Sequence, residues 1–150
     1  MAGIKFLGIF LIPIFLFALE GKVISVTDGD TIKILTPERQ QVKLRLYGID
    51  APEKKQPYGT AAKRYLADLI AGKTVQIEEH GKDRYKRVLG IVYFDGKDVN
   101  EIFVLNGYAW AFTKYSKIYE SQERQARSKW LGLWRDNNPI KPEIWRKIYK

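Results

Sequence analysis

Three acidic side chains of this chain lie in two short motifs whose residue types suit the binding of a hard metal ion. Asp30 ends an Asp-Gly-Asp sequence, and Asp50 and Glu53 lie on either side of Ala51-Pro52. Pro52 restrains its own backbone and that of Ala51, so we expect both acids on a stiff segment. Asp30 and Asp50 are the candidate metal ligands, and Glu53 is the candidate acceptor of a proton from water.

Two arginines, Arg45 and Arg87, are the candidate partners of a phosphate group. Arginine forms paired hydrogen bonds with phosphate oxygens and neutralises the charge that develops on phosphorus during displacement. Tyr85 supplies a ring on which a nucleic-acid base could stack. Each feature alone has a plainer interpretation, such as a hairpin turn at Asp28-Gly29 or a solvated basic loop. The combination indicates hydrolysis of a phosphodiester.

The composition narrows the choice of metal. The chain has one histidine and no cysteine, which argues against a zinc site and excludes disulfides. Coordination by oxygen alone suits Ca²⁺ or Mg²⁺. His80 lies among polar residues, where we expect an exposed loop histidine.

Hydrophobic periodicity predicts strands joined by short turns, followed by helices. The expected strands span residues 23–26, 31–35, 42–46, 74–77 and 88–94, and the expected helices span 61–70, 98–105 and 118–131. Asp98 with Glu101 has the spacing of a helix-capping box. Five strands with an intervening helix predict an α+β fold that is mainly β, namely a five-stranded oligonucleotide/oligosaccharide-binding (OB) barrel with three α-helices.

Length and charge indicate one basic domain. The chain has 150 residues and a formal net charge of +9, with 26 basic against 17 acidic side chains. A basic surface favours a polyanionic partner, because basic residues displace counterions from phosphate backbones. Residues 20–135 are the expected domain, and residues 136–150 are an expected extension that forms a short helix with its apolar side docked on the barrel.

The N-terminal residues 1–19 have the pattern of a targeting segment. Lys5 precedes an apolar run over residues 6–19, which is shorter than the ~20 residues that span a bilayer. We expect a signal peptide, with cleavage after Ala18, and export to the periplasm or the medium. The alternative is a membrane anchor formed by residues 6–19.

Three motifs together resemble the staphylococcal nuclease (thermonuclease) family. They read V-x-D-G-D-T at 26–31, R-L-x-G-I-D-A-P-E at 45–53 and D-x-Y-x-R at 83–87, in family order and at compatible spacing. The resemblance covers about Gly21 to Trp134. It implies a five-stranded barrel with three helices and Ca²⁺-dependent hydrolysis of DNA and RNA to products with 3′-phosphate ends.

The resemblance also implies roles for individual residues. Asp30 and Asp50 match the two calcium carboxylates, and the backbone carbonyl of Ala51 matches a third ligand. Glu53 matches the general base. The remaining matches are the phosphate clamps and the nucleotide contacts, which are Arg45, Arg87, Arg84, Tyr85 and Tyr115.

The chain departs from the best-known family member at two places. Thr113 replaces a second tyrosine of the nucleotide pocket, and the loop after Glu53 is shorter. These changes bear on base stacking and on substrate length. We expect a monomer that prefers single-stranded nucleic acid and requires no protein partner.

Two other functions remain open on the sequence alone. The first is a barrel of the same family that binds single-stranded nucleic acid without cutting it. The presence of every catalytic residue favours the nuclease over this binding module. The second is an anchored interaction protein whose basic face meets anionic lipid.

Overall fold

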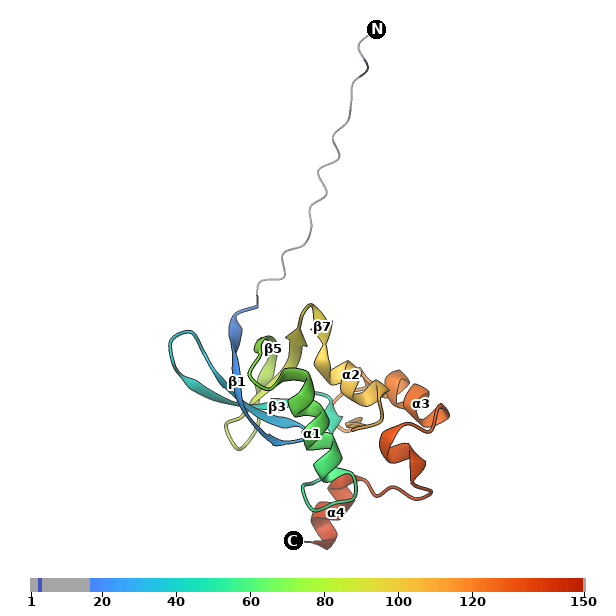
Figure 1. The fold of residues 1–150 in the computed structure, drawn as a ribbon. Coiled ribbons are helices and arrows are strands. Elements are labelled where there is room, and N and C mark those ends of the chain that lie inside the picture. The colour runs from blue at the N-terminus through green and yellow to red at the C-terminus, as the bar shows by residue number, and fades with distance from the viewer. Residues whose placement is uncertain (1–2, 4–16, 150) are drawn as a thin grey trace.

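Five strands close into a small barrel in the computed structural model, which describes residue 3 and residues 17–149 (Figure 1). The strands are β1 (Leu19–Asp28), β2 (Thr31–Leu35), β3 (Gln41–Leu46), β5 (Thr74–Lys82) and β6 (Val88–Phe94). They are ordered β3-β2-β1-β5-β6, and a parallel pairing of β3 with β6 closes the barrel. The predicted five-stranded α+β barrel is therefore confirmed.

Alternating side chains explain why these segments form a closed sheet. Along β3, Leu44 and Leu46 are fully buried, whereas Lys43 is exposed. The turn between β1 and β2 falls at Gly29-Asp30, one residue later than Asp28-Gly29, and Asp28 pairs with Thr31 across it. The barrel interior is filled by aliphatic side chains from every strand, including Ile32, Ile34, Leu44, Ile77 and Val92. Burial of this apolar area stabilises the scaffold that carries the polar rim.

Two helices complete the core. Helix α1 (Gly59–Ile70) buries Ala62, Leu66 and Ile70 at helical spacing. Helix α2 (Val99–Leu105) begins at Asp98, whose side chain accepts a hydrogen bond from the Glu101 amide at 2.9 Å. The expected N-cap at Asp98 is thus confirmed.

The third predicted helix is shorter than expected. Helix α3 spans Glu120–Ser128, whereas the sequence predicts residues 118–131. Tyr119 precedes the helix because its ring is buried and its hydroxyl donates to Asp98 at 2.7 Å. After the helix, Trp130 has a positive φ of 52°, which ends the helical path.

Short elements connect the barrel to the α3 region. Strand β4 (Ile49–Asp50) pairs with β8 (Trp110–Ala111), and β7 (Lys97–Asp98) pairs with β6. A 3₁₀ turn, η1 (Gly132–Arg135), follows α3. A second small apolar cluster contains Trp110, Ala126, Leu133 and Trp134. This cluster fixes the C-terminal half of the chain beside β4.

His80 lies in a strand and not in the loop that the sequence predicts. Strand β5 continues to Lys82, beyond the predicted end at Ile77. The His80 ring stacks on Tyr47, with 4.2 Å between ring centroids and 6° between ring planes. The stacking and the pairing with β6 extend the strand through a polar sequence that has no apolar alternation.

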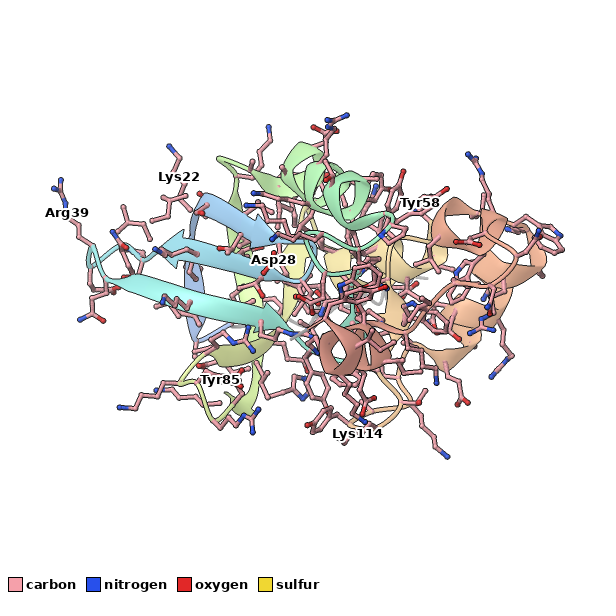
Figure 2. All side chains as sticks on the ribbon, turned by 90° about the horizontal axis from the view of Figure 1, so that it is seen from below. Lys22, Asp28, Arg39, Tyr58, Tyr85 and Lys114 are labelled. Carbon is pink, nitrogen blue, oxygen red and sulfur yellow. The ribbon has the colours of Figure 1, made fainter. Side chains whose placement is uncertain are left out.

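A fourth helix, α4 (Pro142–Ile148), lies at the end of the barrel below α1 in Figure 1. The sequence predicts that its apolar side docks on the barrel, and this prediction is wrong. Ile144 and Ile148 are 47% and 59% exposed, whereas Pro142 is buried. Viewed from below in Figure 2, α4 lies over the barrel end, away from Arg39 on the β2–β3 hairpin.

The expected targeting segment, residues 1–19, falls largely outside the described residues. Among the residues that the structure describes, no helix is both long enough and apolar enough to span a bilayer.

Asn100 provides a test of how α2 is fixed to the barrel. Its buried amide donates to the Tyr47 and Gly90 carbonyls at 2.9 and 3.1 Å and accepts from the Val92 amide at 3.2 Å. We expect Asn100→Ala to lower the free energy of unfolding by about 3 kcal/mol, because buried backbone groups lose their partners. Urea denaturation measures the change.

Asn106, at the other end of α2, offers a matched control, because its side chain is exposed and its one hydrogen bond, to the Ile102 carbonyl at 2.8 Å, lies at the surface. Asn106→Ala should change the free energy of unfolding by less than about 1 kcal/mol. Equal losses in the two variants would contradict the role assigned to Asn100.

Candidate functional site

Asp30 and Asp50 come together at one rim of the barrel, where strands give way to loops. Asp30 lies in the β1–β2 turn and is 8% exposed, and Asp50 ends β4 and is 2% exposed. The Ala51 amide donates to Asp30 Oδ2 at 2.8 Å and so joins the two segments. Gly29 allows this approach, since a Cβ there would lie 2.8 Å from Cβ of Ala51.

Arg45 lies between the two aspartates. Its Nη2 is 3.3 Å from Asp30 Oδ2 and 3.1 Å from Asp50 Oδ1. Its Nη1 donates to the Leu46 and Ile49 carbonyls, both at 2.8 Å. The side chain is only 11% exposed, although its strand position predicts an outward direction. The structure therefore places Arg45 as the cation that holds two buried carboxylates together.

Glu53 lies on the loop after β4, and Gln56 fixes the geometry of this loop. The backbone amide of Glu53 donates to the side-chain oxygen Oε1 of Gln56 at 3.0 Å. In return, the backbone amide of Gln56 donates to the Glu53 carbonyl at 2.9 Å. The Glu53 side chain is 35% exposed, so water has access to it. A carboxylate on a restrained loop with access to water is suited to proton abstraction.

Arg87 is linked to Asp30 through Thr31. Its Nε donates to Asp83 Oδ2 at 2.8 Å, and its Nη1 is 3.5 Å from Thr31 Oγ1. Thr31 in turn donates to Asp30 Oδ1 at 3.1 Å, which links Arg87 to the aspartate pair. Although burial acts to raise it, hydrogen bonds from Arg87 hold the pKa of Asp83 below its ordinary value.

The predicted nucleotide contacts are exposed rings and charges around this rim. Tyr85 is 63% exposed, and the guanidinium groups of Arg84 and Arg87 lie 4.9 and 5.4 Å from its ring centroid. Tyr115 is 65% exposed and packs edge-on against Phe112 at 4.8 Å. In Figure 2, Tyr85 and Lys114, the residue before Tyr115, both lie along the lower edge of the view.

The sequence analysis missed Arg146, which reaches the site from α4. Its Nη1 donates to Glu53 Oε1 at 2.6 Å, and its Nη2 donates to Asp50 Oδ2 at 3.1 Å. A third contact joins Nη1 to Asp50 Oδ1 at 3.2 Å. Arg146 is separated from these acids by more than ninety residues, and no local pattern identifies it.

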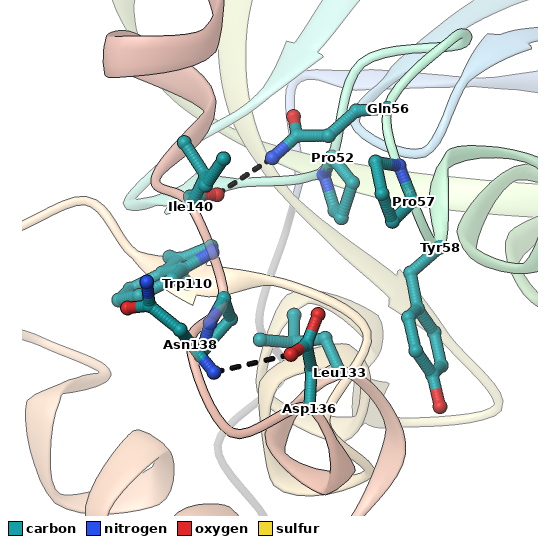
Figure 3. Close-up of a pocket in the computed structure, with 10 residues that line it drawn as sticks. Pro52, Gln56, Pro57, Tyr58, Trp110, Leu133, Asp136, Asn138 and Ile140 are labelled. Carbon is teal, nitrogen blue, oxygen red and sulfur yellow. Dashed lines mark hydrogen bonds between the residues drawn. The ribbon is translucent and has the colours of Figure 1, made fainter.

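Gln56 and Phe112 are two further contributors that the sequence analysis missed. Gln56 Nε2 donates to the Ile140 carbonyl at 2.6 Å, and Figure 3 shows this bond across the pocket between the Glu53 loop and residues 136–140. The Phe112 ring lies 6.0 Å from the Arg45 guanidinium carbon. No sequence pattern identifies Gln56, because its burial and its contacts with Glu53 and Ile140 arise only on folding.

The donor chemistry of the site fits a hard cation bound through oxygen. Among residues 17–149, no group of three or more His, Cys, Asp or Glu side chains is arranged to hold a metal ion. Asp30 and Asp50 would therefore need a backbone carbonyl, such as that of Ala51, and water to complete the coordination. Both carboxylates already face positive guanidinium groups, which shows that positive charge is accommodated there.

Burial changes the protonation of the acidic cluster. It raises the pKa of the Asp50 carboxyl from 3.8 to about 6, with Asp30 adding to the rise and Arg146 and Arg45 opposing it. Burial, aided by the charge of Asp30, also raises the pKa of Asp28. A carboxylate that is costly to ionise gains from a nearby cation, and this favours a positively charged ligand.

Several known proteins with similar sequences are named as nucleases. The profile of the family described as "Staphylococcal nuclease homologue" matches residues 43–136. An "Uncharacterized endonuclease" of Escherichia coli is 42% identical over 143 residues, which cover 93% of each chain. A "Micrococcal nuclease" of Shigella flexneri is 41% identical over 144 residues, covering 87% of this chain and 82% of the relative. An "Uncharacterized endonuclease" of Haemophilus influenzae is 44% identical over 131 residues, or 86% and 74% of the two chains.

The raised pKa of Asp50 predicts a pH dependence of stability in chelator. The Asp50 carboxyl binds its proton more tightly in the folded state than in the unfolded state. Protonation of Asp50 therefore stabilises the fold fully below pH 3.8, and this stabilisation is lost as the pH rises through about 6. Relative to Asp50→Asn, the native chain should therefore lose about 2 kcal/mol of unfolding free energy between pH 4 and 7. Urea denaturation across this range measures the difference.

Asp68→Asn is the control, because Asp68 is exposed on α1. Its stability curve should run parallel to that of the native chain. A parallel curve for Asp50→Asn as well would contradict the buried, proton-binding state of Asp50.

Proposed function

This chain belongs to the staphylococcal nuclease family, and we propose that it is a calcium-dependent nuclease that hydrolyses DNA and RNA to products with 3′-phosphate ends. The observation that carries the proposal is the convergence of Asp30, Asp50 and Glu53 on two guanidinium groups at one rim. Separate parts of the chain supply these side chains, and solvated surface residues would have no reason to meet.

The residues divide the reaction among them. Asp30 and Asp50, with the Ala51 carbonyl, would hold Ca²⁺, which supplies Lewis-acid neutralisation of phosphate oxygens when bound. Glu53 accepts a proton from the water that attacks phosphorus. Phosphorus then forms a bond to the water oxygen and loses its bond to the 5′-oxygen, which leaves and takes up a proton from solvent.

Arg87 and Arg45 stabilise charge in different ways. Arg87 has Nε and Nη1 engaged with Asp83 and Thr31, and its remaining guanidinium edge is directed to binding a phosphate oxygen. Arg45 uses both terminal nitrogens on protein oxygens, so it acts first by positioning the two aspartates. The positive charge of Arg45 also reduces the electrostatic repulsion between the acidic side chains and an approaching phosphodiester.

The exposed rings support single-stranded nucleic acid as the preferred substrate. Tyr85 and Tyr115 are 63% and 65% exposed, so each ring presents a face for stacking with an unpaired base. The net charge of +9 favours binding of the phosphate backbone. No protein partner is needed to complete this arrangement, and we propose that the enzyme acts as a monomer.

Digestion of labelled single-stranded DNA tests the function. With calcium the purified chain should shorten the substrate, and removal of calcium by a chelator should stop the reaction. The products should be extended by a polymerase only after a phosphatase removes their 3′-phosphates. Intact substrate at every calcium concentration would contradict the proposal and indicate a module that binds without cutting.

Two substitutions test the assigned roles. Glu53→Gln should lower the cleavage rate by about 10²–10⁴, because it removes the proton acceptor. Arg87→Ala should lower the rate by about 10²–10³, because it removes one fixed charge from the transition state. Initial rates at saturating calcium measure both effects.

Exposed residues of the same types serve as controls. Glu38 lies between β2 and β3, and Arg64 lies on α1. Glu38→Gln and Arg64→Ala should cleave at the native rate. Native rates for Glu53→Gln or Arg87→Ala, with circular dichroism unchanged, would reject the corresponding role.

We propose further that residues 1–18 direct export and are removed after Ala18. β1 begins at Leu19, which pairs with Ile77, so cleavage there would leave the whole barrel in the mature chain. Intact-mass analysis of the periplasmic and secreted fractions of a bacterial host should find the shortened chain. Full-length chain in the membrane fraction would indicate an anchor, and full-length chain in the cytosol would contradict export.

A further inference from the structure

Helix α4 places one arginine directly across the acidic cluster. Arg146 contacts Glu53 Oε1 at 2.6 Å and both oxygens of Asp50 at 3.1 and 3.2 Å. Asp50 Oδ1 also accepts from Arg45 at 3.1 Å, so guanidinium donors face both oxygens of this carboxylate. Arg146 is thus hydrogen-bonded to the two acids that the proposed reaction uses, Asp50 for binding the cation and Glu53 for accepting the proton.

The segment leading into α4 is fixed by contacts with the rim of the site. Gln56, which also binds the Glu53 amide, donates to the Ile140 carbonyl at 2.6 Å (Figure 3). Pro142 is buried, and Lys114 Nζ lies 3.6 Å from Glu143 Oε1. These contacts direct the first turn of α4 toward the acids and place Arg146 one turn further along.

Much of the apolar surface of this helix is exposed to solvent. Ile144, Ile148 and Tyr149 are 47%, 59% and 62% exposed. The Arg146 side chain is itself 40% exposed, which weakens its ion pairs through solvent screening. A short helix that is held by polar contacts and contributes no residue to the barrel core can leave without disturbing that core.

We infer that α4 is a self-blocking segment, in which Arg146 competes with the cation for Asp50 and with the attacking water for Glu53. This inference rests on the proposed function, because it assigns these two acids to cation binding and proton transfer. Binding of the cation and the polynucleotide displaces Arg146, and their departure lets α4 return.

The competition follows from charge and from lone pairs. The hydrogen atoms of Arg146 occupy carboxylate lone pairs that a metal ligand must offer. Two positive groups on one carboxylate also repel each other, so each lowers the affinity for the other. Glu53 Oε1 accepts the shortest of the three contacts and cannot take a proton from water through the same lone pair.

Isothermal titration calorimetry of the full chain with calcium tests the inference, because it measures calcium binding and does not depend on cleavage. If α4 covers the site about nine-tenths of the time, Arg146→Ala should lower the apparent dissociation constant for calcium about tenfold. Lys147→Ala removes the same charge from the next, exposed position of the helix. It should leave the dissociation constant within about twofold, which separates the contact from the general field of the helix.

Cleavage assays then separate this inference from the proposed function. Arg146→Ala should need about tenfold less calcium for half-maximal cleavage, with an unchanged rate at saturating calcium. If no variant cleaves nucleic acid but the difference in calcium affinity persists, the self-blocking role stands and the nuclease proposal fails.

Three results would overturn the inference. The first is equal calcium affinity in the native chain and Arg146→Ala, and the second is no calcium binding in any variant. The third is a lower cleavage rate of Arg146→Ala at saturating calcium with a higher KM, which would make Arg146 a clamp for the substrate. In that case Arg146→Ala would impair cleavage, whereas the self-blocking role requires that it cleave at the native rate and need less calcium.

Discussion

The guanidinium group of Arg45, held between the buried carboxylates of Asp30 and Asp50, is the interaction on which the site depends. Burying two like charges side by side is costly, and the raised pKa of Asp50 shows the cost. Arg45 offsets it with contacts of 3.3 and 3.1 Å and with two hydrogen bonds to carbonyls that precede Asp50. The β1–β2 turn and β4 are thereby held at a distance that lets both acids serve one ligand.

The barrel supports this arrangement by separating its apolar interior from its polar rim. Fully buried aliphatic side chains such as Ile32 and Leu44 fix the strands, and the acids lie just beyond the strand ends. Glu53 and Arg87 approach from loops on either side, restrained by Gln56 and Asp83. A rigid core with polar loops at one end is a common way to hold reactive groups in place.

Much of this organisation could be predicted from the sequence because its signals are local. Strand alternation, the Asp98 cap and the motifs of the staphylococcal nuclease family each lie within a few residues. The inward turn of Arg45 and the approach of Arg146 could not be predicted, because both depend on partners brought together by folding. The orientation of α4 was also predicted wrongly. Its apolar repeat predicts that Ile144 and Ile148 face the barrel, but polar contacts of Gln56 and Arg146 set the orientation of the helix and leave both residues exposed.

A crystal structure of the chain with calcium, with the ion identified by anomalous scattering, tests the central claim most directly. The account predicts one ion with oxygens of both Asp30 and Asp50 at about 2.3–2.6 Å, and Arg146 withdrawn from Asp50. An ion bound elsewhere, or Arg146 still paired with Asp50 at saturating calcium and no ion between the aspartates, would contradict it.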